Sequence, residues 1–138
     1  MQLHQPWRSM RDLPDWHVHF TDELPAKVKG VTRWEDQTVW IKAGLSQAER
    51  RSVIEHERQH ILRGPGGHRG REEKTVRQST ARRLISQEAL VDALKWSRDE
   101  HDIADELWVS VAVVRARLDG LTRAEQDEIE RALDDDWR

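Results

Sequence analysis

The chain has 138 residues, of which 36% are hydrophobic and 36% charged, and its formal net charge is −3. It contains no cysteine, which excludes disulfides, thiolate metal ligands and a cysteine nucleophile. Seven tryptophans argue against a disordered chain, and no apolar run reaches the ~18 residues of a membrane span, so we expect one soluble, cytoplasmic domain.

Charge is distributed unevenly along the chain. Residues 63–83 hold seven basic and two acidic side chains, a net of +5, whereas residues 84–138 hold seven basic and fifteen acidic ones, a net of −8. A nucleic-acid-binding domain usually carries a dominant basic face, and this pattern does not provide one. Direct nucleic-acid binding is therefore not expected.

The first third of the chain carries strand signals. Two prolines and the lack of a period predict an irregular arm over residues 1–14. From Asp15 to Asp22, apolar residues including Phe20 alternate with His17 and His19, which predicts a half-buried strand with both histidines outward. With two later runs this predicts a small antiparallel sheet, its strands over residues 15–22, 27–34 and 38–42. The last strand would bind an extended peptide if its edge were open, although a buried strand has the same pattern.

Helix start signals follow. Ser46 and Glu49 form a capping box, and similar signals stand at Ser86, Ser97–Glu100, Ser110 and Thr122. They predict helices over 47–62, 72–85 and 87–96, a short helix ending at 107, and helices over 111–120 and 123–133 before a frayed tail. Strands first and helices after predict an α+β domain in which the sheet packs on the first long helix. We divide it into the arm (1–14), the strands with two helices (15–85) and a helix-turn-helix-like C-terminal part (86–138).

The first long helix contains His56-Glu57-Arg58-Gln59-His60, an H-E-x-x-H motif. Four residues apart on a helix, His56 and His60 lie on one face, and the apolar residues around them turn that face toward the core. Buried imidazoles and a buried carboxylate need a shared partner, which a zinc ion provides. Glu57 would then act as the general base on a zinc-activated water. The alternative is a polar stripe in an amphipathic helix.

A catalytic zinc needs a third protein ligand. An extended H-E-x-x-H-x-x-G-x-x-H motif is excluded, because Arg63 stands at its glycine position and Gly66 at its last histidine. In the next helix Glu73 lies at the centre of the apolar face, whereas Glu72 points away from it. Glu73 is therefore the preferred ligand, and His68 in the glycine-rich loop is the competing one.

Over roughly residues 38–121 the chain resembles the ImmA/IrrE metallopeptidases. The resemblance is carried by the capped H-E-x-x-H helix, by Glu73 with the following Ala81-Arg82-Arg83-Leu84-Ile85, and by the segment from Ile103 to Leu118. It implies that His56, His60 and Glu73 bind Zn²⁺ and that Glu57 is the catalytic base of an endopeptidase. It also implies a protein substrate, a helix-turn-helix transcriptional repressor encoded nearby.

The chain departs from the family pattern in three respects. Arg77 stands where the family usually has asparagine or aspartate, and Ser86 stands where the stretch often closes with proline. There is also no tyrosine to stabilise an oxyanion. Arg63, His68 or a histidine of the first strand remain candidates for that role or for substrate contacts.

A second hypothesis is a non-catalytic anti-repressor or a DNA-binding module. Residues 103–118 have the pattern of a helix-turn-helix, in which the second helix reads DNA. That helix offers only Arg115 and Arg117 within the segment of net charge −8, a field that repels phosphates. We therefore expect these helices to serve packing or substrate recognition. The sequence carries no signal for the oligomeric state.

Overall fold

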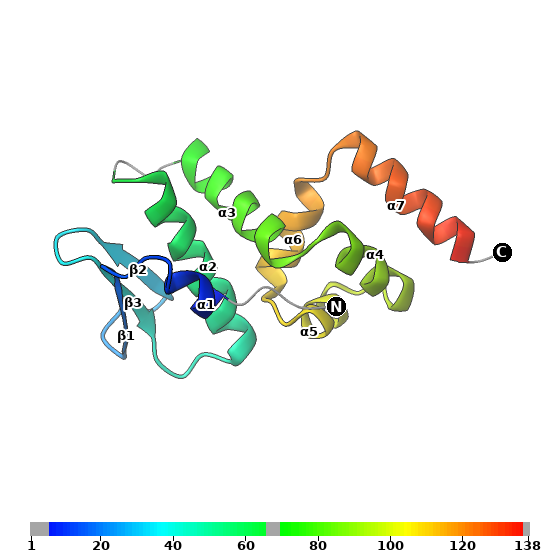
Figure 1. Cartoon of the computed structure of the whole chain (residues 1–138). Helices are drawn as coiled ribbons and strands as arrows, with labels where there is room; N and C mark the ends of the chain where they lie inside the picture. The colour runs from blue at the N-terminus through cyan, green and yellow to red at the C-terminus, as the bar shows by residue number, and fades with distance from the viewer. Residues whose placement is uncertain (1–5, 66–69, 137–138) are drawn as a thin grey trace.

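The α+β class is confirmed in a computed structural model that describes residues 6–65 and 70–136 (Figure 1). A short helix and three strands come first, and six further helices follow. Their bounds are α1 Pro6–Met10, β1 His17–Thr21, β2 Gly30–Arg33, β3 Thr38–Lys42, α2 Gln47–Arg63, α3 Arg71–Leu84, α4 Gln87–Trp96, α5 Glu100–Leu107, α6 Val111–Asp119 and α7 Arg123–Asp136. Within the described ranges no helix is long and apolar enough to cross a membrane.

The sheet is mixed, not antiparallel throughout. Its strand order is β1-β3-β2, with β1 parallel and β2 antiparallel to the central β3. The turn between Arg33 and Thr38 makes β2 and β3 a hairpin, whereas the longer connection after β1 lets that strand pair with the far side of β3. The prediction that β3 has an open edge is therefore wrong, because β3 is paired on both sides. β2 is an edge strand, open on the side away from β3.

Local details also differ from the sequence prediction. The arm contains α1, and Phe20 is 47% exposed, with its ring centroid 5.9 Å from that of Trp7 in α1. The cap of α5 is Asp99, whose carboxylate accepts two helix-start amides. Ser97 lies one step earlier: its hydroxyl donates to the Asp102 carboxylate and accepts from the amide of Asp99. The last helix continues through Asp136 and does not fray after residue 133.

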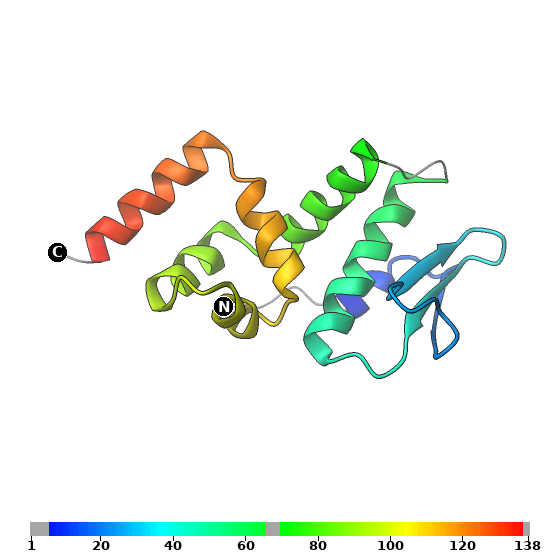
Figure 2. The same ribbon diagram turned by 180° about the vertical axis from the view of Figure 1, so that it is seen from behind.

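Two apolar clusters lie on either side of the α2–α3 pair. One joins α1, the sheet and α2 through Met10, Val39, Ile41, Ile54 and Ile61. The other is formed by α3 to α7. Figures 1 and 2 show the sheet at one end of the molecule and α7 at the other, with α2 and α3 side by side between them. The packing of α2 against α3 determines which side chains of the two helices face each other.

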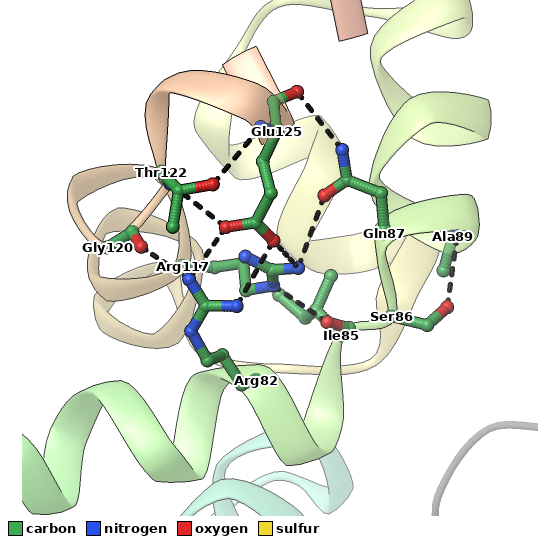
Figure 3. Close-up of polar contacts among 9 residues, drawn as sticks. All are labelled: Arg82, Ile85, Ser86, Gln87, Ala89, Arg117, Gly120, Thr122 and Glu125. Atoms are coloured by element: carbon green, nitrogen blue, oxygen red, sulfur yellow. Dashed lines mark hydrogen bonds and ion pairs between the residues drawn. The ribbon is translucent and has the colours of Figure 1, made fainter. Parts of the chain in front are cut away.

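A polar cluster joins α7 to α3 and α6 (Figure 3). The Glu125 carboxylate accepts two hydrogen bonds from Arg82, at 2.8 and 3.1 Å, and one from the backbone amide of Thr122. It also lies 3.6 Å from the guanidinium of Arg117, which is only 3% exposed and donates to the carbonyl of Ile85. Arg117 is thus a structural cation of the core, not a surface group.

Candidate metal centre

The two motif histidines lie one turn apart on α2. Ser46 caps this helix by accepting from the amide of Glu49, so the phase of the helix is fixed at its start. The Nε2 atoms of His56 and His60 are 3.2 Å apart. Their side chains are 25% and 10% exposed, so both sit in the wall of a cleft and not on open surface.

The third group comes from α3. Oε1 of Glu73 is 2.8 Å from Nε2 of His56, and Oε2 is 3.3 Å from Nε2 of His60. Glu72, the neighbouring carboxylate, is exposed. The difference follows from the buried side of α3, formed by Val76, Thr80, Ala81 and Leu84, which turns Glu73 toward α2.

These three donors suit zinc in type and spacing. Histidine nitrogens and a carboxylate oxygen are ordinary zinc ligands, and all the candidate ligand atoms lie within 4.8 Å of one another. Two ligands each ~2.0–2.1 Å from a tetrahedral ion are about 3.3 Å apart, close to the 3.2 Å between the two Nε2 atoms. Without an ion, the same contacts would be a histidine–carboxylate hydrogen-bonded cluster.

Glu57 lies beside this group and is held by β2. Its side chain is buried, and Oε2 accepts a hydrogen bond of 2.6 Å from Oγ1 of Thr32. At Gly30 a Cβ atom would come within 2.6 Å of Cγ1 of Val53 and within 3.2 Å of Glu57, so only glycine lets the strand approach α2 this closely. The sequence prediction missed both Thr32 and Gly30, although strand alternation would have placed them on one face.

Two hollows meet at the candidate metal centre. A cleft of about 430 Å³ contains His56, His60, Glu57 and Glu73 under β2. A larger groove of about 720 Å³ extends from it toward α5 and α6. Gly30, His56 and Glu57 line both, so the groove is continuous with the centre.

The other candidate residues lie elsewhere. Arg63 is exposed at the end of α2 and lines neither hollow, and His68 falls outside the described residues. His17 and His19 are exposed on the outer face of the sheet, where His19 stacks on Trp40.

Arg77, noted in the sequence only as a departure from the family pattern, does line the groove. Its position four residues after Glu73, on the same face of α3, is the signal that could have identified it.

The helix-turn-helix-like segment is built into the same region. α6 packs against α3, and residues of both helices line the groove. Arg115 is paired with Glu100, and Arg117 is buried. Arg51 of α2 donates to two carbonyls at the end of α5, at 2.9 and 3.1 Å, which ties this segment to the motif helix.

Comparison with known proteins identifies no relative of the chain. No family model, no curated protein and no solved structure matches the chain. The resemblance to the ImmA/IrrE metallopeptidases therefore rests on the motif residues alone.

Proposed function

We propose that the protein is a zinc-dependent endopeptidase that hydrolyses a peptide bond in a protein substrate. The observation that carries the proposal is the convergence of His56, His60 and Glu73 from two helices, with the buried carboxylate of Glu57 beside them. In this proposal the first three residues hold the metal. Zinc bound there would polarise the scissile carbonyl and lower the pKa of a water molecule to about 7.

Glu57 is assigned the proton transfers. Thr32 holds Oε2 of the carboxylate, which orients the group. In the proposed mechanism the Glu57 carboxylate takes a proton from the attacking water and delivers it to the nitrogen of the leaving amine. Burial of the carboxylate beside the strand keeps its orientation fixed during both transfers.

The open edge of β2 supports a peptide as the substrate. The amide of Lys42 donates to the carbonyl of Lys29, so in the antiparallel ladder Val31 and Arg33 also point their backbone groups toward β3. The N–H and C=O groups of Gly30 and Thr32 then point to the open edge. An extended chain paired there would pass directly over Glu57 and His56, by strand addition.

A transcriptional repressor as the natural substrate is supported by the family resemblance alone. The packing of α6 on α3 and the pairing of Arg115 leave the DNA-binding alternative with little basic surface on the helix that would read DNA. The anti-repressor alternative predicts loss of repressor function with no cleavage product. An assay that separates cleavage from association therefore distinguishes the two.

Metal content and cleavage test the proposal directly. Metal analysis of the purified protein should find about one zinc per chain. Glu57→Gln should retain that zinc and lose peptide hydrolysis, since it removes the base and no ligand. Glu73→Ala should lower zinc occupancy whereas Glu72→Ala, its matched control, should not. Unchanged hydrolysis in Glu57→Gln, or equal zinc content in Glu73→Ala and wild type, would refute the assignment.

A further inference from the structure

The groove beside the metal centre has a floor of small apolar side chains. It is bounded by the segment 27–30, by the first half of α2 and by α5 and α6. Because these side chains are short, they leave room in the groove for a larger apolar side chain to contact them. Its apolar lining includes Val28, Val53, Ala104, Val109, Ala112 and Ala116.

Arg77 supplies charge on the wall nearest the metal centre. On α3 it lies one turn beyond Glu73, on the same face of the helix, and it lines the groove together with His56. It is exposed and forms no hydrogen bond or ion pair with any other described residue. Elsewhere in the groove Lys29 pairs with Glu49 at 2.9 Å. Lys27 is a second exposed cation at the end of the groove formed by residues 27–30, and Asp105 of α5 adds a negative charge.

We infer that this groove is the specificity site of the proposed peptidase, binding a substrate segment with a bulky aliphatic or aromatic side chain next to an acidic one. The identification of the bound molecule as a peptide rests on the proposed function. The apolar side chain fills the floor between α2 and α6, and the acidic side chain pairs with Arg77. The helix-turn-helix-like segment is then a wall of the substrate site.

Continuity and charge support this occupant. A chain paired with the open edge of β2 runs from the metal cleft past Gly30 into the groove, because Gly30 lines both. A bulky apolar residue gains most by leaving water in a groove of this lining. An unpaired guanidinium favours a carboxylate partner, which it binds in bidentate geometry.

Binding can be measured without cleavage. A pool of random decapeptides is selected on immobilised Glu57→Gln protein loaded with zinc, and the bound peptides are sequenced. We expect severalfold enrichment of leucine, isoleucine, phenylalanine or methionine adjacent to aspartate or glutamate. A bound fraction with the composition of the input pool would overturn the inference.

Two variants then assign the preference to its residues. Ala112→Trp, on an exposed position of α6 in the groove, should abolish the apolar enrichment, while Ala124→Trp on the exposed face of α7 should not. Arg77→Glu should replace the acidic preference by a basic one, while Lys74→Glu, on the same helix but outside the groove, should leave it acidic. Profiles of Ala112→Trp and Arg77→Glu identical to wild type would refute the site.

The same pool, incubated with zinc-loaded wild-type protein, separates this inference from the proposed function. Selection with the expected profile but no cleavage would retain the groove and refute the peptidase. Cleavage that Glu57→Gln abolishes, with products lacking the apolar and acidic preference, would retain the peptidase and refute the groove.

Discussion

Replacing Glu125 by glutamine removes the negative charge at the centre of the cluster in Figure 3. Arg82 and the Thr122 amide hold the pKa of this carboxyl at about 2, against an ordinary value of 4.5. A shift of that size corresponds to about 3 kcal/mol at most. The side chain is 20% exposed, and solvent screening reduces this value. The substitution also leaves buried Arg117 without its nearby carboxylate. We expect the free energy of unfolding to fall by about 1.5–2 kcal/mol, and the melting temperature by roughly 5–8 °C.

The assay is urea unfolding followed by circular dichroism, at several pH values. Because the pKa of Glu125 is lower in the folded than in the unfolded chain, its stabilisation is fully present above about pH 5. It is lost as pH falls through about 2. The difference between wild type and Glu125→Gln should therefore be constant near pH 7 and shrink between pH 5 and pH 2.

A matched control is Glu128→Gln, which neutralises an exposed carboxylate on the same helix. Its effect should stay within about 0.5 kcal/mol. If Glu125→Gln unfolded with the same free energy as Glu128→Gln, or if its deficit persisted at pH 2, the cluster would not stabilise α7 in the way described.

Three further substitutions probe the contacts around α2. Thr32→Val keeps the shape of the side chain but removes the donor to Glu57, so kcat should fall about tenfold with zinc content unchanged; equal kcat would contradict the orienting role. Gly30→Ala should cost about 1–3 kcal/mol in urea unfolding, because its Cβ would overlap Val53, and Val53→Ala should recover part of this loss. Arg51→Met should cost about 2–3 kcal/mol by leaving two carbonyls at the end of α5 without their charged donor, and a neutral effect in the same assay would show that this tie is dispensable.

Much of the candidate site could be predicted from local patterns. The spacing of His56 and His60 requires only a helix, and the Ser46 cap supplies one. The choice of Glu73 over Glu72 needed only the apolar side of the next helix. Thr32, Gly30 and the groove were not predicted, because each depends on which strand lies over α2.

The sequence by itself therefore determined the class of the fold, the start of most helices and the face on which the motif lies, since helical and strand periods are local properties. Only the tertiary structure decided the sheet order, in which β3 is central and β2 forms the edge beside Glu57. It also decided that α6 packs on α3 and lines a groove. These pairings join residues far apart in the chain, and their free energies come from packing and backbone hydrogen bonds that no local pattern encodes.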